Sequence, residues 1–260
     1  MGFGPVELAC LRISISFFCC LPIVVKALKT VPKEKLFTLF MIGIISIGLP
    51  AFLFALSLTK GESAINGIIN SLSPLWTVVI GYYFFSVSVS GKKLLGVVIG
   101  FMGAVVLVAG KPGFSFKADG IYSVLPILAT LCYGLGTNLT KKNLQAEKPL
   151  DITALSMSMA GIPALIGLFF THAPAKIATG QVWVPLAAIA ALAVFGTFIA
   201  WILFYRLLQR TDMLFATSVT YLVPIVAISW GMLDGEVLSI IQIGGMMLIL
   251  TGVYFTTRSS

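Results

Sequence analysis

The sequence predicts an all-α membrane protein in which nine transmembrane helices form two inverted repeats, of four and five helices. Three observations predict this fold class: the chain is too apolar for a water-soluble surface, its apolar stretches have the length of membrane spans, and two of its regions match at a constant offset. Of its 260 residues, 58% are hydrophobic and 10% are charged, and the mean hydropathy is +1.05. This composition is typical of a chain whose main solvent is lipid.

The apolar stretches can be counted as windows of about 20 residues, the length with which a helix crosses a hydrocarbon core of about 30 Å. Nine such windows cover residues 6–27, 36–58, 63–85, 92–110, 121–143, 151–170, 182–205, 214–233 and 237–255. The connections between them are short and contain turn-forming residues. The sequence therefore predicts one membrane domain without a separate soluble domain.

Basic residues are concentrated on alternate connections. Twelve of them fall on the connections that we assign to the cytoplasmic side: Lys26, Lys29, Lys33, Lys35, Lys92, Lys93, Lys141, Lys142, Lys148, Arg206, Arg210 and Arg258. The opposite connections carry only Lys60, Lys111, Lys117 and Lys176. This positive-inside bias predicts an outer N-terminus and a cytoplasmic C-terminus in the cell (plasma or inner) membrane. It also accounts for the net charge of +8 without a nucleic-acid partner.

Two regions of the chain match each other at an offset of 150 residues. Phe54, Lys60, Glu62, Pro74 and Gly81 recur as Phe204, Arg210, Asp212, Pro224 and Gly231. After one residue of slippage, Gly96 and Gly103 recur as Gly245 and Gly252. Equivalent windows start on opposite sides of the membrane, so the repeats, residues 1–110 and 121–255, are predicted to be inverted. Such a pair can open to either side around one central site, which is the build of a secondary transporter.

Several short motifs follow one another in a characteristic order. They are a Pro and then an Arg early in the first window, a Pro in each repeat, and an acidic turn before a Gly-rich helix: Pro5 and Arg12, Pro74 and Pro224, and Gly235-Glu236 before Ile243-Gly-Gly. This order resembles the EamA-type drug/metabolite transporters. The resemblance implies a carrier of small organic metabolites with ten helices in two five-helix repeats and both termini in the cytoplasm.

Two departures from that family pattern affect the prediction. The segment Ser86-Val-Ser-Val-Ser90 stands where the family usually has an acidic turn. Because Pro5-Val-Glu7 pairs with Pro149-Leu-Asp151, nothing in the first half corresponds to residues 121–143. The resemblance thus implies that the first helix of the family is absent upstream of Met1, which leaves nine helices and an outer N-terminus, as the charge bias predicts independently.

A polar stripe in the third window is the first candidate for a solute site. Ser63, Asn66, Asn70, Ser73 and Thr77 are spaced by three and four residues, so they share one helix face. Asparagine side chains supply donors and acceptors that suit a zwitterionic or amide-bearing solute. The adjoining Pro74 frees a backbone carbonyl near mid-bilayer. The alternative is hydrogen bonding between helices, worth about 0.6 kcal/mol per contact.

The matching helix of the second repeat carries Thr217, Thr220 and Tyr221 ahead of Pro224. Inverted symmetry predicts that this stripe and the asparagine stripe line the same central cavity. Trp201, on the preceding helix, belongs to an aromatic face that could stack on a ring or a cation. Packing or interface anchoring is the alternative for such a face.

The remaining candidates are structural. Arg12 lies within its helix, where a charge requires compensation, and we leave open snorkelling to the outer surface and a structural lock or anion site near the outer mouth. Asp151 and Glu236 stand at helix starts and are expected to act as caps. A final set of glycines is expected to allow close helix packing, within a monomer or in a homodimer: Gly96, Gly103, Gly245 and Gly252.

Other function classes find little support in the residues. The single histidine, His172, has no second carboxylate at ligand spacing, so neither a metal site nor an enzyme active site is expected. No phosphate-binding glycine loop suggests ATP-driven transport, and no cofactor is expected. An inactive or scaffold fragment remains the alternative to a secondary carrier. The expected partners are a small-molecule substrate and the lipid bilayer.

Overall fold

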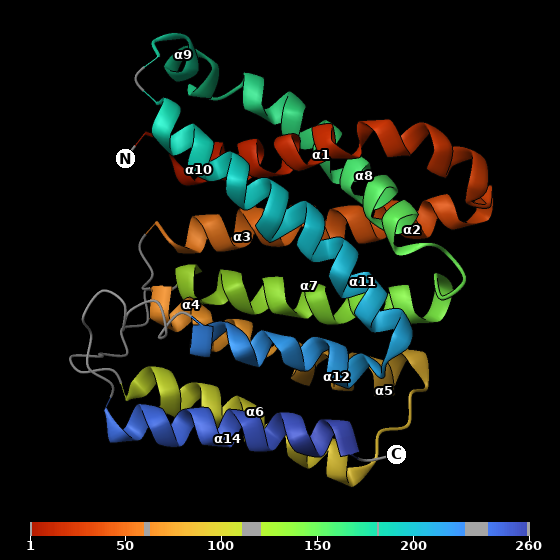
Figure 1. The fold of residues 1–260 in the computed structure, drawn as a ribbon, viewed down its shortest axis with the longest axis vertical. Helices are drawn as coiled ribbons and strands as arrows, with labels where there is room; N and C mark the ends of the chain where they lie inside the picture. Colours follow the sequence, from red (N-terminus) through yellow and green to blue (C-terminus); the bar gives the residue numbers. More distant parts are fainter. Residues whose placement is uncertain (1, 60–62, 111–120, 181, 227–238, 259–260) are drawn as a thin grey trace. The chain divides into compact units, whose positions relative to one another are not determined.

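The computed structural model describes residues 2–59, 63–110, 121–180, 182–226 and 239–258 (Figure 1). Within these ranges the regular elements are all helices. The chain divides into two compact units, of which unit 1 comprises Met1–Thr59 and Leu139–Arg210, and unit 2 comprises Lys60–Asn138 and Thr211–Ser260. Each unit therefore combines segments from both halves of the sequence.

Six helices in the described part of the chain are long and apolar enough to cross a membrane. They are Pro5–Thr30, Lys33–Ser57, Asn66–Phe85, Gly91–Ala109, Pro149–Phe169 and Trp183–Arg210. Two shorter apolar helices, Met213–Val226 and Ile240–Thr256, fall in the last two predicted windows. The prediction of an all-helical, multi-pass membrane protein is confirmed, whereas the count of nine spans stays a prediction.

Some residues used in the sequence analysis lie outside the described ranges. They include three of the basic residues of the sparsely charged side, two members of the repeat pattern and the expected helix cap: Lys60, Lys111, Lys117, Glu62, Gly231 and Glu236.

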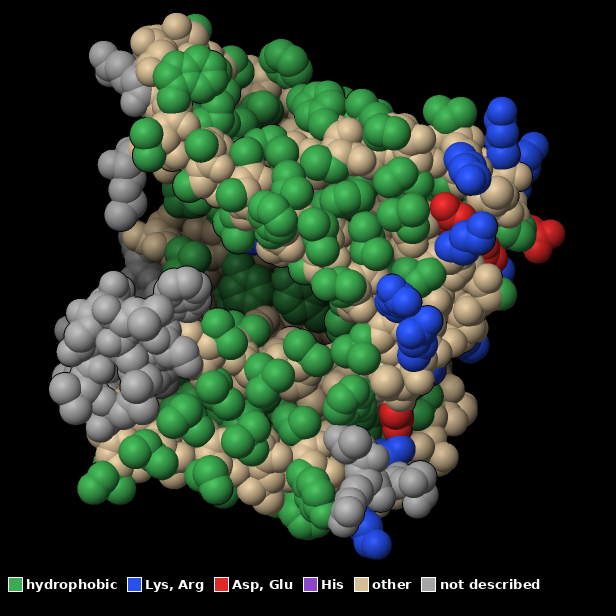
Figure 2. Space-filling view, viewed as in Figure 1, with side chains coloured by type: hydrophobic (Ala, Val, Ile, Leu, Met, Phe, Trp, Pro, Cys, Tyr) green, Lys and Arg blue, Asp and Glu red, His purple; other side chains and the backbone are tan. Residues whose placement is uncertain are grey.

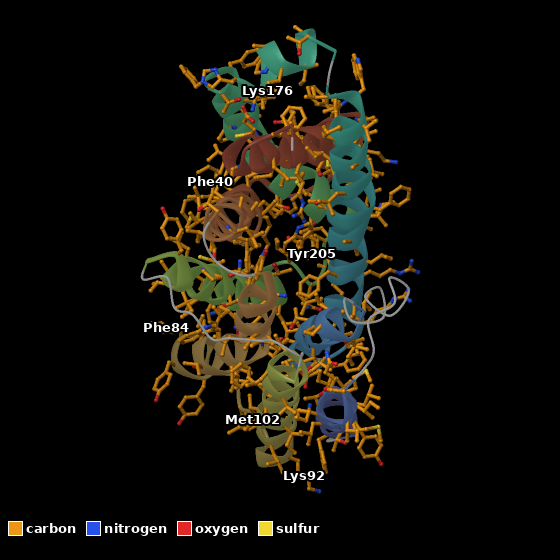
Figure 3. The ribbon with its side chains drawn as sticks, turned by 90° about the vertical axis from the view of Figure 1, so that its left-hand side faces the viewer. Phe40, Phe84, Lys92, Met102, Lys176 and Tyr205 are labelled. Atoms are coloured by element: carbon orange, nitrogen blue, oxygen red, sulfur yellow. The ribbon has the colours of Figure 1, made fainter. Side chains whose placement is uncertain are left out.

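Unit 1 is built on an antiparallel pair of helices, α1 (Pro5–Thr30) and α8 (Pro149–Phe169). At one end, the Thr30 hydroxyl donates to the Asp151 carboxylate over 3.2 Å. At the other end, Lys176 in the short helix α9 (Ala173–Ala178) forms a 2.7 Å ion pair with Glu7 (Figure 3). Asp151 lies in the first turn of α8, where its charge is favoured as expected, but Lys148 is the N-cap residue, and the Asp151 carboxylate links α8 to α1.

The two ends of unit 1 differ strongly in charge. The end marked by Thr30 and Asp151 also receives the end of α11 (Ala200–Arg210), because the Gln209 amide donates to the carbonyls of Leu144 and Glu147 over 3.1 and 2.6 Å. Figure 2 shows lysine and arginine side chains gathered at this end. The helix ends and connections of unit 1 that meet there carry Lys26, Lys29, Lys33, Lys35, Lys141, Lys142, Lys148, Arg206 and Arg210. The charge asymmetry of the sequence is thus an end-to-end asymmetry of unit 1.

Two long helices of unit 1 each contain a π-helical segment. The first follows the short 3-10 turn η1 (Lys33–Lys35) and consists of α2 (Leu36–Ile42), η2 (Gly43–Gly48) and α3 (Leu49–Ser57). The second consists of α10 (Trp183–Ala193), η3 (Val194–Ile199) and α11. The π segments begin at residues 43 and 194, within one residue of the sequence offset of 150. Each adds an extra residue to one turn, a feature frequent at functional sites.

Unit 2 contains the remaining helices. They are α4 (Ser63–Asn70), α5 (Ser73–Phe85), α6 (Gly91–Ala109), most of α7 (Ile121–Asn143), α12 (Met213–Ser218), the 3-10 turn η4 (Val219–Tyr221) and α14 (Ile240–Arg258). Lys93 at the start of α6 is ion-paired with Asp212, which also accepts a hydrogen bond from the Leu214 amide and so caps α12.

The predicted window 63–85 is interrupted rather than continuous. Helix α4 ends at Asn70 and α5 begins at Ser73, because Pro74 has no amide hydrogen to continue the helical bonding. The carbonyl of Asn70, which Pro74 leaves without its usual donor, accepts the Ser73 hydroxyl at 2.8 Å. Beyond the break, α5 runs to an exposed aromatic end where Phe84 projects outward (Figure 3).

Helices α6 and α14 approach each other backbone to backbone through their glycines. A Cβ atom added at Gly252 would lie 2.4 Å from the backbone nitrogen of Gly100, and one at Gly96 would lie 2.8 Å from the Gly252 carbonyl oxygen. Added at Gly103, it would lie 2.6 Å from the backbone nitrogen of Ile249. Any side chain at these positions would force two backbones apart, so the glycines make this contact possible.

Two adjacent glycines of α14 allow a matched test of that contact. A Cβ at Gly245 would lie 2.5 Å from the backbone nitrogen of Leu107, whereas a Cβ at Gly244 would meet nothing within 4 Å. We expect Gly245→Ala to destabilise the protein by about 1–3 kcal/mol through overpacking. Gly244→Ala should leave stability unchanged or slightly raised. Thermal unfolding in detergent measures both, and equal midpoints for the two variants would contradict the backbone contact.

Candidate solute-binding site

The asparagine stripe lies in unit 2, on α4 and α5. Asn66, Ser73 and Thr77 are buried, and Asn70 is partly exposed. The side chain of Ser63 lies outside the part that the structure describes. The Thr77 hydroxyl donates to the Ser73 carbonyl over 2.9 Å. The Ser73 hydroxyl donates in the same way to the Asn70 carbonyl. Both hydroxyls thus donate to backbone carbonyls next to the helix break. Asn70, directly before the break, is the stripe member that combines a carboxamide with partial exposure.

The second stripe lies on α12 and η4, in the same unit. Helix α12 packs against α5 and α6, so the two polar stripes are carried by contacting helices. The Thr217 hydroxyl donates to the Met213 carbonyl over 2.9 Å, and Thr220 donates to the Thr217 carbonyl over the same distance. Thr217 is buried and Thr220 partly exposed. Pro224, one turn further on, is also buried.

Tyr221 joins this stripe to α6. Its side chain is fully buried, and its hydroxyl donates to the Val97 carbonyl over 2.8 Å. The ring occupies space left by Gly100, where a Cβ would lie 2.6 Å from the Tyr221 ring. The bond is therefore a side-chain link between η4 and α6.

Asn138 of α7 is a polar contact that the sequence analysis did not single out. Its amide nitrogen donates to the carbonyls of Thr77 and Gly134, over 3.0 and 2.9 Å, and so ties α7 to α5. Its amide oxygen is buried without a hydrogen-bond partner among the described residues, facing Gly81. The available signal was an asparagine inside an apolar window, since such a group must find partners within the protein.

Trp201 lies in unit 1, on α11. Its ring is 5.6 Å from that of Phe204 and 5.2 Å from that of Tyr205, measured between centroids, so three aromatic side chains form one face. Tyr205, labelled in Figure 3, is 1% exposed. Trp201 is partly buried against the core formed by α1, η2 and α8. Trp201 therefore combines core packing with residual exposure.

Arg12 bridges α1 and the π segment η3. Its Nε donates to the Thr197 hydroxyl over 2.6 Å, and a terminal nitrogen donates to the Gly196 carbonyl over 3.4 Å. Glu7, five residues earlier, is engaged by Lys176 and by the Gly4 amide. Of the alternatives left open by the sequence, the contacts of Arg12 match those of a link between helices.

The described residues contain no group of three or more His, Cys, Asp or Glu side chains placed to hold a metal ion. What the two stripes offer chemically is a set of neutral donors and acceptors on contacting helices. Such groups can orient a polar solute without binding it as an ion.

The Tyr221 bond gives a test of structure at this site. Tyr221→Phe removes one buried hydrogen bond while the Val97 carbonyl keeps its place within α6, so we expect a loss of about 0.5–1.5 kcal/mol in stability. Tyr83→Phe, which removes the hydroxyl of a 74% exposed side chain, is the matched control and should change nothing. Denaturant or thermal unfolding in detergent compares them. A Tyr221→Phe variant as stable as the control would show that the bond does not hold η4 to α6.

Comparison with known proteins finds similarity along nearly the whole chain. A model of the EamA-like transporter family matches residues 2–109 and 120–258. An uncharacterized transporter of Archaeoglobus fulgidus is 24% identical over 98% of this chain and 89% of its own length. Probable amino-acid metabolite efflux pumps of Salmonella typhimurium and Escherichia coli are 26% and 24% identical, over 86% and 96% of this chain and 77% and 84% of their own.

A solved crystal structure shares the fold. It superimposes with a TM-score of 0.77 at 17% sequence identity, and the alignment covers 98% of this chain and 88% of that one.

Proposed function

The chain belongs to the EamA-like transporter family, and from this membership we propose that it is a secondary carrier that moves small organic metabolites by alternating access. The observation that carries the proposal is the extent of the family match, which covers both halves of the chain. The matched stretches, residues 2–109 and 120–258, are separated by residues 110–119, within one residue of the boundary between the sequence repeats. A membrane transporter is what the family and the named relatives share.

Alternating access requires two related halves that can exchange roles across the membrane. The matching positions of η2 and η3 support such a pair, since a π turn is rare and two at equivalent places in unrelated halves would be a coincidence. The charge asymmetry of unit 1 supports an outer N-terminus and a cytoplasmic C-terminus, in the cell membrane.

Amino acids or related metabolites are the proposed substrates, with export as the direction. The names of two relatives, probable amino-acid metabolite efflux pumps, support this class. The chemistry of the stripes supports it too, because carboxamides and hydroxyls match the donors and acceptors of a zwitterion. The proposed substrate-binding residues are Asn66, Asn70, Ser73, Thr77, Thr217, Thr220 and Tyr221 in unit 2, and Trp201 in unit 1.

Within this set, Asn70 is the proposed direct contact. It is partly exposed and stands at the helix break, whereas the hydroxyls of Ser73, Thr77 and Tyr221 are used by backbone carbonyls. The proposed environment of the chain is the lipid bilayer.

We propose no dimer contact through the glycines of α6 and α14, because these glycines already lie at the contact of the two helices with each other.

Replacing Asn70 tests the site. Asn70→Leu removes the carboxamide but keeps the carbonyl that accepts Ser73, so the helix break should persist and the protein should fold. We expect uptake of the transported solute into proteoliposomes to fall at least tenfold, measured with a labelled panel of amino acids and other metabolites. Tenfold corresponds to about 1.4 kcal/mol of lost interaction with the solute.

Thr251→Val is the matched control, because it also removes a polar group from unit 2 but at an exposed position of α14. It should transport like the unmodified chain. Normal uptake by Asn70→Leu would overturn the assignment of this residue. Absence of uptake of every compound by the unmodified chain would favour the inactive or scaffold alternative.

A further inference from the structure

The two π segments of unit 1 are docked on the central pair of helices in a crossed manner. Segment η2, from the first half of the chain, packs on α8, and η3, from the second half, packs on α1. The docking residues also correspond: Arg12 follows Pro5 by the same seven residues as Ser156 follows Pro149. The same crossing therefore occurs twice in unit 1, which makes the two contacts directly comparable.

The contact of η2 with α8 depends on close backbone approach. A Cβ added at Gly43 would lie 2.3 Å from the Ser156 carbonyl oxygen and 2.9 Å from the Cβ of Met159. Gly48 is at the other end of the segment. A Cβ added there would lie 3.6 Å from the Cβ of Ala160. Small residues thus fix η2 by shape.

The contact of η3 with α1 adds side-chain hydrogen bonds to the apolar packing of Phe198. Arg12 donates to the Thr197 hydroxyl and the Gly196 carbonyl, both within the π segment. One turn along α1, the Ser16 hydroxyl lies 2.9 Å from the carbonyl oxygen of Ala193, the residue before the segment. At the contact of η2 with α8, Gly43 allows close backbone approach. At the contact of η3 with α1, the Arg12 guanidinium bonds to two successive residues of the π segment.

The register of a π segment sets the direction of the helix that follows it. Conversion of η3 to a regular α-helical turn would rotate the residues beyond it by about 100° relative to those before it. Trp201, four residues after Thr197, is the first aromatic side chain beyond the segment. Whatever holds η3 in its π form therefore also holds the aromatic face of Trp201, Phe204 and Tyr205 in place.

We propose that Arg12 is a positioning residue of the carrier: its bonds to Thr197 and Gly196 maintain the π register of η3 and thereby orient Trp201 for the solute. The role of Trp201 in transport rests on the proposed function, but the effect of Arg12 on η3 does not. Arg12 need not contact the solute.

Hydrogen–deuterium exchange of the purified chain in detergent tests the effect on η3 directly. In Arg12→Gln and in Thr197→Val, backbone amides of residues 194–201 should exchange about tenfold faster, the effect of losing a hydrogen bond to a charged group. Exchange in α8 should be unchanged. Thr197→Ser, which keeps the hydroxyl, should restore slow exchange. Ser14→Ala is the control on α1, because the Ser14 hydroxyl is buried without a hydrogen-bond partner among the described residues.

Transport kinetics test the consequence for Trp201. Arg12→Gln should raise the KM for the solute, and adding it to Trp201→Ala should raise the KM no further, because both changes act through the same ring. Unchanged exchange at residues 194–201 in both Arg12→Gln and Thr197→Val would overturn the proposal, as would faster exchange spread evenly over unit 1. Additive effects on KM would also overturn it. Since the exchange experiment needs no solute, an unmodified chain without transport would count against the proposed function alone.

Discussion

The absence of water in the bilayer core is the constraint on which the rest of this structure depends, since every buried polar group must then be bonded within the protein. Many buried serine and threonine hydroxyls meet it by donating to a carbonyl of the preceding turn, as Thr77, Thr153 and Ser218 do, whereas Ser14 and Ser46 have no partner among the described residues. The same demand explains why Ser73 bonds to the carbonyl that Pro74 leaves free. A polar side chain in this chain is therefore first a structural group, and its availability to a solute must be judged after that use.

Lipid also removes most of the hydrophobic drive for helices to associate, so close approach and hydrogen bonds have to supply it. Helices α6 and α14 combine close approach at their glycines with apolar packing of Leu107 against Ile249. Unit 1 uses both means at equivalent crossings, glycine at η2 and the Arg12 guanidinium at η3.

Hydropathy, charge and repetition predicted the helical membrane class and the approximate place of the helices, because these depend on composition over about 20 residues. Local backbone features depend on single residues and were missed. A π turn differs from an α turn by one residue, which leaves no trace in hydropathy, so η2 and η3 were not anticipated. Pro74 was recognised, but not that α4 would end at Asn70. The place of Asp151 in the first turn of α8 was predicted, but its bond to α1 was not, because sequence does not show which helix is the neighbour.

We propose that this chain carries a solute by exposing one site alternately to each side of the membrane. Trans-stimulation tests it most directly: proteoliposomes are loaded with a labelled metabolite, and its efflux is timed with and without the same unlabelled compound outside. An alternating carrier returns faster when loaded, so external solute should accelerate efflux in a saturable way. Efflux that external solute leaves unchanged, or slows, would contradict the account.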